Sequence, residues 1–570
     1  MLICGINASH TASAALIRDG RLISALQEER PTRFKNKGGF PEKAIQRLLE
    51  MEGLEWKDVD AYVFGGHETY TESGLQEGDR SLRIRSYKNA LKPMGRVKQF
   101  LRHTPLRGRV QRQRREAQTQ VLMGHGVSRD RIFSIDHHRC HATTAYFGPG
   151  ADEQALVITI DGAGDYLCAT VSIPEEGGRL KRLATVDEAH SIGNLWSVIT
   201  ALLAMVPLEH EYKLMGMAPY AGGDKADKAR KVFQDAFRYT EGGWELAPGV
   251  PNMLFSYEFW RERLEFTRFD HVCAGLQDFT EAFLAEWVRG WLKRTGRSKI
   301  RLSGGVCMNV KLNKAIGELA EVSDLFVFPS CGDETNAIGA AWAHMVDLGQ
   351  AHLIEPLKTL YLGPEPTRED YDAAADQARS LGWKVELPGD LEEAVVDLLA
   401  RGEVVARVAG REEFGARSLG NRAILGDPIS GEVVRVVNKA IKSRDFWMPF
   451  APSVLAEAAD RYLHNPKGLT APYMILSFDS RNTGEVKAAC HPEDGTIRPQ
   501  VVSPEANPSY HRLLSCFQQR TGRGALLNTS LNIHGEPIVS TAADAIDVMK
   551  RSGLHHLSLG PYLISKPDRA

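Results

Sequence analysis

The feature that most constrains the fold is a strand, turn and strand unit that occurs twice in the first third of the chain. The first unit runs from LICGIN through the small-residue turn ASHTAS to AALIRDGRLISALQEER, in which RDG signals a hairpin. The second, ALVITIDGAGDYLCATVSI, begins at Ala155 and repeats the order of buried strand, Gly/Asp turn and strand. Two such units predict a duplicated α/β fold whose two turns face one ligand.

Length and charge limit the class of protein. The chain has 570 residues, too many for one core, and its formal net charge of -2 gives no general attraction to nucleic acid or anionic membranes. Its eight cysteines are scattered without a C-x-x-C pair, which fits a reducing cytosol. The start, MLICGINASH, has no basic leader, and no apolar run approaches the ~18 residues that span a bilayer. We therefore expect a cytoplasmic protein without a membrane span.

Glycine-rich turns suggest phosphate contacts. Gly162 and Gly164 follow a buried strand in TIDGAGD, where exposed backbone N–H groups suit phosphate oxygens. Gly304 and Gly305, in IRLSGGVCMN, would let a nucleotide approach the N-terminus of the following helix. The alternative for each is a tight turn that needs glycine for its geometry alone.

The stretch SIDHHRCHATTAYF places three histidines beside an aspartate. His137 and His141 are four apart, so on a helix they share one face at about 6 Å between Cβ atoms. A metal site becomes the better interpretation if Asp161 and Asp333, each at the end of a predicted strand, converge on them. Two imidazoles and two carboxylates suit Fe(II), Mn(II) or Zn(II). The alternative is a structural role for the histidines.

Two further side chains are candidates for chemistry near these turns. His10, in NASHTASAA, could accept a proton from an attacking hydroxyl, or could be a hydrogen-bonded surface residue. Lys213, in LEHEYKLMGMAPY, offers a charge contact to phosphate, although a solvated lysine is an equal alternative.

The stretch from Arg80 to Arg115 holds 13 Lys or Arg and no acidic residue. A solvated insertion is the simplest interpretation, and a surface for an anionic acceptor, nucleic acid or a membrane is the alternative. Tyr87 and Phe100 are the only Phe, Tyr or Trp residues in this stretch, so stacking on unpaired bases is poorly supported.

The proline-rich stretch PLKTLYLGPEPTRED predicts a domain edge, so we expect one domain over 1–355 and a second over 356–570. After it, WKVEL, DLEEAVVDLLARG and VVARVAG predict a strand, a helix and a strand of another α/β domain. This domain carries basic and polar side chains in loops bounded by glycine and proline, which favours an anion pocket. They are Arg417, Arg422, Lys442, Arg444, Arg498, Asn528, Ser530 and Asn532.

Taken together, these motifs resemble the O-carbamoyltransferases of the NodU/CmcH family over essentially the full length. The matching motifs are HHRCH, TIDGAGD, KLMGMAPY, LSGGVCMN, FVFPSCGDETNAIGAA, FGARSLGNRAILGDP, WMPFAPSVL, YMILSF and LNTSLNIHGEPIV. The resemblance implies an actin/hexokinase-like N-terminal domain, similar to the tRNA threonylcarbamoyl transferases, followed by a YrdC-like α/β domain.

The resemblance also implies chemistry in two steps. The YrdC-like domain would make carbamoyl adenylate from carbamoyl phosphate and ATP, with Mg accompanying the ATP. The N-terminal domain would then pass the carbamoyl group to a hydroxyl of a small acceptor in antibiotic or other secondary-metabolite biosynthesis. The expected partner is therefore a small-molecule alcohol, and we allow for a homodimer.

Residue roles follow from the matching positions. His137, His141, Asp161 and Asp333 would bind a divalent metal, iron(II) before others, while His10 and Lys442 would be catalytic. Contacts to ATP and carbamoyl phosphate are expected at Gly162, Gly164, Lys213, Gly304, Gly305, Asn309, Arg417, Arg422, Lys442, Arg444, Arg498, Asn528 and Ser530.

One position departs from the family pattern. Relatives usually have W-R-P-F where this chain has Met448 in WMPF, so either Arg444 substitutes for the missing arginine or phosphate is held more loosely. Two other functions stay open at this point. One is a tRNA carbamoylating or threonylcarbamoylating enzyme, against which the near-neutral charge and sparse aromatics speak, and the other is a nucleotide-binding regulator without transfer activity.

Overall fold

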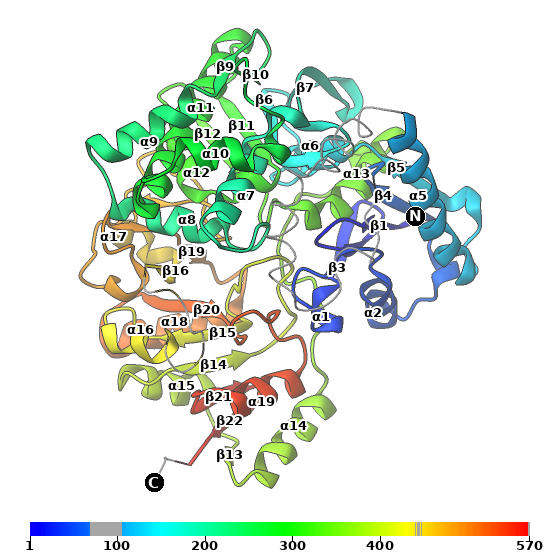
Figure 1. Cartoon of the computed structure of the whole chain (residues 1–570). Helices are drawn as coiled ribbons and strands as arrows, with labels where there is room; N and C mark the ends of the chain where they lie inside the picture. The colour runs from blue at the N-terminus through cyan, green and yellow to red at the C-terminus, as the bar shows by residue number, and fades with distance from the viewer. Residues whose placement is uncertain (69–104, 439–440, 442–444, 446, 568–570) are drawn as a thin grey trace. The chain divides into compact units, whose positions relative to one another are not determined.

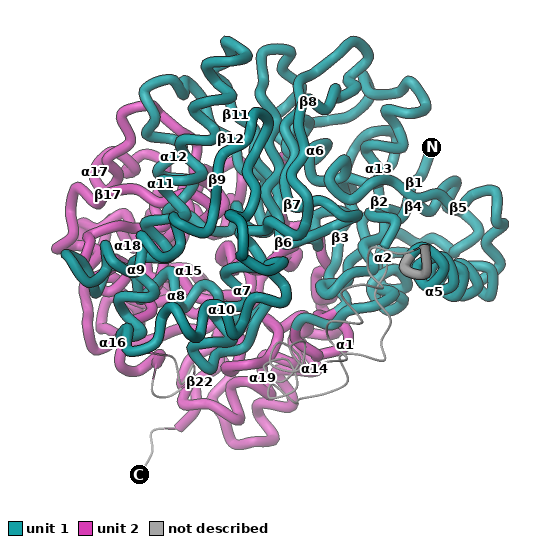
Figure 2. Tube along the Cα trace, turned by 45° about the horizontal axis from the view of Figure 1, so that its top comes forward, with its two compact units in different colours: residues 1–28, 36–357 teal, residues 29–35, 358–570 magenta. Residues whose placement is uncertain are grey.

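The computed structural model describes residues 1–68, 105–438, 441, 445 and 447–567 (Figure 1). The predicted site residues Lys442 and Arg444, and most of the basic stretch, lie outside this range. Over the described chain there are two compact units, coloured separately in Figure 2. The first comprises residues 1–28 and 36–357, and the second comprises 29–35 and 358–570. No sequence feature had separated residues 29–35 from the N-terminal domain.

In the described part of the first unit, two five-stranded sheets have the same design. The first has the order β3-β2-β1-β4-β5, in which the β3/β2 and β2/β1 pairs are antiparallel and the β1/β4 and β4/β5 pairs are parallel. The strands are β1 (Leu2–Asn7), β2 (Ser13–Arg18), β3 (Arg21–Gln27), β4 (Ala61–Gly65) and β5 (Ile132–Ile135). The central strand β1 is buried at every position, as its apolar sequence predicts.

The second sheet repeats the first in strand order and direction. Its order β8-β7-β6-β11-β12 again joins three antiparallel strands to two parallel ones. The strands are β6 (Ala155–Gly164), β7 (Leu167–Pro174), β8 (Leu180–Asp187), β11 (Lys299–Ser303) and β12 (Asp324–Val327). The predicted duplication of an α/β fold is therefore confirmed.

Two helices are exchanged between the halves of this unit. Helix α6 (His137–Phe147) follows the last strand of the first sheet but packs on β6 and β11 of the second. Helix α13 (Asn336–Asp347) follows the last strand of the second sheet but packs on β1, β2 and β4 of the first. The helices also pack on each other, and there a Cβ on Gly339 would lie 2.2 Å from the carbonyl oxygen of Cys140. Glycine is needed because the two backbones approach so closely.

The remaining elements of the first unit surround these layers. The longest described helix, α11, buries Phe279, Phe283, Trp287 and Trp291 and packs on α9 and α12. The helices are α2 (Glu42–Glu52), α5 (Pro105–Gly124), α7 (Ile192–Leu202), α8 (Glu211–Met217), α9 (Asp224–Gln234), α10 (Tyr257–Arg263), α11 (Phe269–Thr295) and α12 (Val310–Glu318), and a short hairpin joins β9 (Phe237–Tyr239) to β10 (Trp244–Leu246). None of the described helices is both long and apolar enough to cross a membrane.

The second unit is a mixed α/β domain, as predicted. Its described residues form an eight-stranded sheet of order β13-β22-β21-β14-β15-β20-β16-β19, in which only the β14/β21 and β16/β19 pairs are parallel. The strands are β13 (Lys384–Glu386), β14 (Val405–Val408), β15 (Arg422–Gly426), β16 (Ala451–Leu455), β19 (Gln500–Val502), β20 (Ala525–Ser530), β21 (His556–Leu559) and β22 (Tyr562–Ser565). The expected strand, helix and strand after the domain edge are β13, α15 (Leu391–Ala400) and β14.

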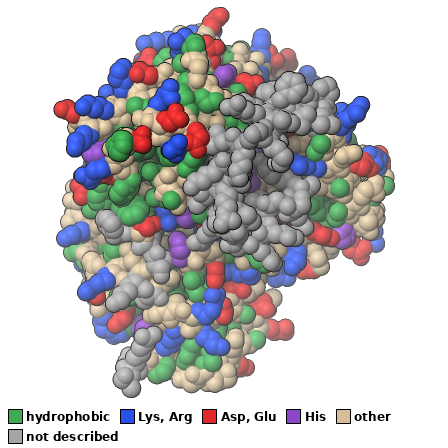
Figure 3. Space-filling view, in the orientation of Figure 1, with side chains coloured by type: hydrophobic (Ala, Val, Ile, Leu, Met, Phe, Trp, Pro, Cys, Tyr) green, Lys and Arg blue, Asp and Glu red, His purple; other side chains and the backbone are tan. Residues whose placement is uncertain are grey.

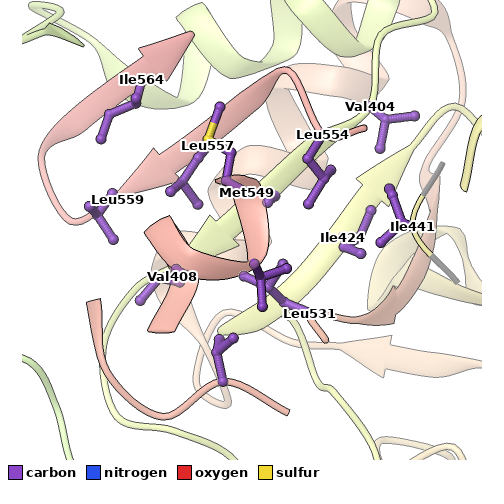
Figure 4. Packing of buried hydrophobic residues seen from close by; sticks show 14 of the residues in the cluster. Val404, Val408, Ile424, Ile441, Leu531, Met549, Leu554, Leu557, Leu559 and Ile564 are labelled. Carbon is purple, nitrogen blue, oxygen red and sulfur yellow. The ribbon is translucent and has the colours of Figure 1, made fainter. Parts of the chain in front are cut away.

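Buried apolar side chains hold the helices of the second unit to its sheet. In Figure 4, Met549 of α19 (Ala542–Arg551) lies among strand residues that include Val408, Leu557 and Ile564. Helix α14 (Arg368–Ser380) adds alanines to the same core, and α15 packs on α18 (Pro508–Thr521). On the face that Figure 3 shows, basic and acidic side chains are interspersed, in keeping with the small net charge.

The close packing of α6 on α13 predicts that two helical glycines differ in how an alanine substitution changes the stability of the protein. Replacing Gly339 by alanine should lower the free energy of unfolding by about 1–3 kcal/mol or more, because the added methyl group meets the backbone of α6. A Cβ added to Gly290 on α11 would have no neighbouring atom within 4 Å, so Gly290→Ala should be neutral or stabilising by up to about 1 kcal/mol. Chemical denaturation measures both, and equal effects would contradict the packing described.

Candidate metal centre

The four side chains predicted to bind metal meet inside the first unit. His137 and His141 lie one turn apart on α6, Asp161 lies near the end of β6, and Asp333 begins the short helix η9 (Asp333–Thr335) after β12. One ligand atom from each lies within 4.8 Å of the others, and all four residues are buried. The structure thus brings the predicted set together, while its metal-binding role stays a prediction.

The separations suit a single ion. His137 Nε2 lies 3.1 Å from Asp161 Oδ2 and 3.5 Å from Asp333 Oδ1. His141 Nε2 lies 3.6 Å from the same Asp333 oxygen. Ligand atoms bound to one metal at about 2.1 Å are themselves about 3–4 Å apart. Little movement is therefore needed for the four atoms to share one cation.

The electrostatics of the cluster also favour a cation at its centre. Burial alone would lower the pKa of His137, but the Asp333 and Asp161 carboxylates raise it to about 10. The imidazoles hold the pKa of Asp161 and Asp333 below the usual range, although burial opposes this. Two buried carboxylates therefore require nearby positive charge, which either protonated imidazole or a divalent ion can supply. Two imidazoles and two carboxylates form a donor set that suits Fe(II), Mn(II) or Zn(II).

Side chains behind the ligands orient them. His141 Nδ1 lies 3.2 Å from Ser303 Oγ, which leaves Nε2 for the centre of the cluster. Asp161 Oδ1 accepts the N–H of Gly305 at 2.7 Å, so only its other oxygen faces His137. The Asn336 amide lies 3.4 Å from His137 Nδ1, and among the described residues its buried Oδ1 has no partner. A metal on Nε2 would fix a proton on Nδ1, for which this oxygen is a ready acceptor.

The start of α6 is fixed by two aspartates and a glycine. Asp136 caps the helix through the N–H of Arg139 at 2.8 Å. Asp165 accepts the N–H of His137 at 2.8 Å and also that of His67 at 2.9 Å. A Cβ on Gly164 would lie 2.2 Å from the His137 ring, so this glycine makes room for the imidazole. Its predicted phosphate contact is not needed to explain its presence.

Two other predicted residues of the first unit, Gly304 and Asn309, have local structural roles as well. Gly304 has a φ of 103°, and a Cβ there would lie 2.3 Å from the Ile160 carbonyl oxygen. Asn309 caps α12 through the N–H of Leu312 and exchanges amide hydrogen bonds with Gln277. Gly162 has more space, since only the Asn194 amide oxygen approaches a Cβ there, at 3.7 Å. Lys213 lies on α8 with its side chain buried.

His10 is the most accessible imidazole of the cluster. Its Nδ1 lies 3.4 Å from Asp333 Oδ2, and its side chain is 26% exposed, against 7% for His137 and none for His141. Burial lowers the pKa of His10, but the hydrogen bond and charge of Asp333 outweigh it and raise the pKa overall. Next to Asp333, burial raises the pKa of Glu334 to about 7. His10 is thus the side chain placed to meet an incoming molecule.

The second unit gathers several predicted anion contacts at one edge of its sheet. Strand β20 ends at this edge with Asn528 and Ser530, and its antiparallel neighbours β15 and β16 begin there. Arg417 lies in the loop before β15, and Arg498 lies just before β19, which is parallel to β16. The topology therefore brings these four residues to a common edge.

One expectation for this edge is corrected by the contacts. The guanidinium of Arg422 is fully buried and donates to five backbone carbonyl oxygens, so it holds loops together and does not face an anion. The carbonyls belong to Pro364, Ala409, Gly410, Asn421 and Ser540. Met448 is buried as well, at 6% exposure, and its thioether carries no charge that could replace the arginine usual at this position.

Asn528 is partly engaged within the protein. Its Nδ2 donates to the Ser418 carbonyl, Ser453 Oγ and Gln500 Oε1 at 2.9–3.3 Å. Its buried Oδ1 has no partner among the described residues, which leaves one acceptor for a ligand.

Sequence reasoning missed the supporting residues of both sites. Asn336 and Ser303 lie within the singled-out motifs SCGDETN and IRLSGG, yet nothing in those motifs shows which polar residue faces the ligands. In the second unit, Glu413 Oε1 accepts the N–H groups of Leu419, Asn421 and Arg422 and so shapes the loop that carries Arg417. Its position in GREEFGARSLGNRAIL, close before that loop, is the one local signal that could have pointed to it.

Metal binding can be tested with a neighbouring histidine as control. The protein is incubated with Fe(II), Mn(II) or Zn(II) in turn, and unbound metal is then removed by desalting. The wild-type protein should retain one ion per chain. His137→Ala should weaken metal binding at least about 100-fold, because a ligand is lost. His138 lies outside the cluster, with its Nδ1 2.8 Å from Thr159 Oγ1, so His138→Ala should keep the ion. Elemental analysis gives the stoichiometry, and equal loss in both variants would contradict the ligand assignment.

Two regions of the chain match family models, and known proteins have similar sequences. Residues 2–342 match the family model for the carbamoyltransferase N-terminus, and residues 396–566 match that for the carbamoyltransferase C-terminus. The nodulation protein NolNO of Sinorhizobium fredii (strain NBRC 101917 / NGR234) is 33% identical over 98% of this chain and 79% of that protein. A 3'-hydroxymethylcephem-O-carbamoyltransferase of Amycolatopsis lactamdurans is 32% identical over 46% of this chain and 48% of that protein.

Solved structures show more distant similarity. Component A of the (R)-2-hydroxyglutaryl-CoA dehydratase of Acidaminococcus fermentans covers 61% of this chain and 99% of its own, at 15% identity and a TM-score of 0.35. Full-length HypF in a phosphate- and nucleotide-bound form covers 61% of this chain and 55% of its own, at 12% identity and a TM-score of 0.34. On the two family models and the relatives in sequence, the chain belongs to the NodU/CmcH family of carbamoyltransferases, as its motifs predicted.

Proposed function

We propose that the protein is an ATP-dependent O-carbamoyltransferase with two sites. The second unit would form carbamoyl adenylate from carbamoyl phosphate and ATP, and the first would transfer the carbamoyl group to a hydroxyl of a small natural-product acceptor. The observation that carries the proposal is the buried cluster of His137, His141, Asp161 and Asp333 with the accessible His10 at its edge.

The activation step follows from the weak reactivity of a carbamate. Loss of phosphate from carbamoyl phosphate, with water, gives carbamate, whose oxygen then attacks the α-phosphorus of ATP and releases pyrophosphate. The product is a mixed anhydride with AMP as a good leaving group. Arg417 and Arg498, at the edge where β20 ends, supply positive charge of the kind that phosphate oxygens require. Asn528 Oδ1, which no described residue contacts by a hydrogen bond, suits a donor N–H such as that of a carbamoyl group.

The transfer step assigns a role to His10. The acceptor oxygen would attack the carbamoyl carbon, its proton would pass to His10, and AMP would leave. Asp333 orients the imidazole through Nδ1 and stabilises the imidazolium that forms. A divalent metal bound by the four ligands would supply positive charge for the phosphoryl oxygens of the adenylate.

The class of acceptor rests on the relatives. The name of the Amycolatopsis lactamdurans relative states that it carbamoylates a hydroxymethyl group of a cephem. That supports an alcohol on a small molecule as the acceptor here, and the accessible position of His10 is consistent with an acceptor that enters from solvent.

The two steps can be separated by measuring pyrophosphate. With carbamoyl phosphate and ATP the wild-type protein should release pyrophosphate, and the matching alcohol from an acceptor panel should increase turnover. Arg417→Ala or Lys442→Ala should reduce pyrophosphate release at least about tenfold, since each removes a charge from the anion site. His10→Asn should leave adenylate formation intact and slow transfer by about 10²–10⁴-fold, because the base is lost.

The His10 and Arg417 variants control for each other, because each should impair only one step. Damage to the transfer step alone in both variants would contradict the assignment of steps to units. Absence of pyrophosphate from the wild-type protein would contradict the proposed activation chemistry.

A further inference from the structure

A short N-terminal segment belongs to the second unit. The chain leaves the first unit after Glu28, and residues 29–35, which include α1 (Glu29–Thr32), group with residues 358–570 before the chain returns to the first unit. Within this segment Arg30 is 1% exposed and is among the largest fully buried side chains. A guanidinium is seldom buried without partners, so its contacts indicate what it holds.

Arg30 contacts the loop that leads to β15. Its Nη2 donates to the carbonyl oxygen of Gly415 at 2.8 Å, and its Nη1 lies 3.8 Å from Glu412 Oε1. Glu412 is itself buried and accepts the hydroxyl of Ser540. Burial raises the pKa of Glu412, and the charge of Arg30 opposes this more than that of Arg422 does. Without Arg30, this carboxyl would lose a nearby positive charge.

A second arginine fastens the same segment. Arg33 donates through Nη1 to the carbonyl oxygen of Ile538 at 2.7 Å and through Nη2 to that of Pro537 at 3.0 Å. Its Nε also lies 3.7 Å from Asp544. These bonds to the backbone fix the segment in the second unit independently of Arg30.

The loop that Arg30 contacts is the one that carries Arg417. Gly415 has a φ of 105° and precedes Arg417 by two residues. Beyond Arg417, the loop closes on Glu413, whose carboxylate accepts the N–H of Leu419 at 2.8 Å and that of Asn421 at 2.8 Å. The loop is thus held on both sides of Arg417. Arg30 binds the backbone at Gly415, before Arg417, and Glu413 binds the backbone at Leu419 and Asn421, after it.

We propose that Arg30 is a positioning residue for the carbamate-activating site, which it serves by holding the Gly415 backbone and the Glu412 carboxylate beneath the loop that bears Arg417. The inference rests on the proposed function and adds to it a residue far from the second unit in sequence. Arginine is required because its planar group can hold a carbonyl and face a carboxylate at once, which a single ammonium cannot reproduce.

The chain on either side of this segment is bound to the turn that contains His10. The N–H of Glu28 donates to Ala12 O at 2.8 Å, and Ala12 N–H donates to Lys37 O at 2.9 Å. The N–H of Gly39 donates to Ser9 O at 3.0 Å. All of these bonds join backbone atoms, so replacing the Arg30 side chain removes none of them, and the change should address the activating site alone.

The test uses the full chain with Arg30→Lys and Arg30→Gln. Both should lower kcat/KM for pyrophosphate release with carbamoyl phosphate and ATP by about 10–100-fold, the size expected when a binding group is displaced by about 1 Å. Transfer from supplied carbamoyl adenylate to an alcohol should change less than about twofold. A merely structural role would impair both half-reactions in parallel, and that result, or unchanged pyrophosphate release, would overturn the proposal.

Arg297→Lys is the matched control in the first unit. Arg297 also donates to backbone carbonyls, those of Glu153 and Ala155, and it lies at neither candidate site. Its replacement should leave both half-reactions unchanged.

Hydrogen exchange tests the inference even if the wild-type protein releases no pyrophosphate, a result that would count against the proposed function and not against Arg30. In Arg30→Lys, peptides covering residues 411–421 should exchange at least about tenfold faster than in wild type, while those from α6 should not change. Equal exchange in the 411–421 peptides of both proteins would overturn the positioning role.

Discussion

The structure of the first unit depends on two carboxylates that are buried within reach of the same imidazole. Asp161 and Asp333 both approach His137, at 3.1 and 3.5 Å, in a place almost closed to water. Like charges at this distance are unfavourable unless positive charge lies between them. The His137 imidazole can supply that charge. Asp136 and Asp165 accept backbone N–H groups at the start of α6, and Gly164 leaves space for the ring, so His137 is positioned beside the two carboxylates.

Duplication explains why these groups meet. Asp161 lies near the end of β6 and Asp333 follows β12, both of the second sheet, and His10 lies in the turn after β1 of the first. The histidines come from α6, which leaves the first sheet and packs on the second. Gly339 allows the close contact of α6 with α13, at Cys140 between the two histidines. The cluster is therefore assembled from both halves, and neither half could form it alone.

Local patterns in the sequence predicted much of this arrangement. The repeated strand and turn unit predicted the duplication, and the four-residue spacing of His137 and His141 predicted their common face, because both signals depend on neighbours in sequence. The predictions that changed depend on distant partners. Arg422 was predicted to contact an anion, but its guanidinium donates hydrogen bonds to backbone carbonyl oxygens up to 118 positions away in sequence. The contact of Arg30 with Gly415 spans 385 positions, and no local pattern could reveal it.

The two units differ in the side chains that they offer to negatively charged ligands. The first offers acids and imidazoles that together suit a divalent cation, whereas the second offers arginines and amides at a sheet edge that suit an anion directly. This contrast fits a division between activating a carbamate and holding the activated product for transfer.

The most direct measurement of the central claim is anomalous X-ray diffraction, at the absorption edge of the bound metal, from crystals grown at neutral pH. The account predicts one strong peak about 2.1 Å from the inward-facing nitrogens of both α6 histidines and from an oxygen of each aspartate. The same four side chains turned apart around ordered water, with the metal absent or held elsewhere, would contradict it.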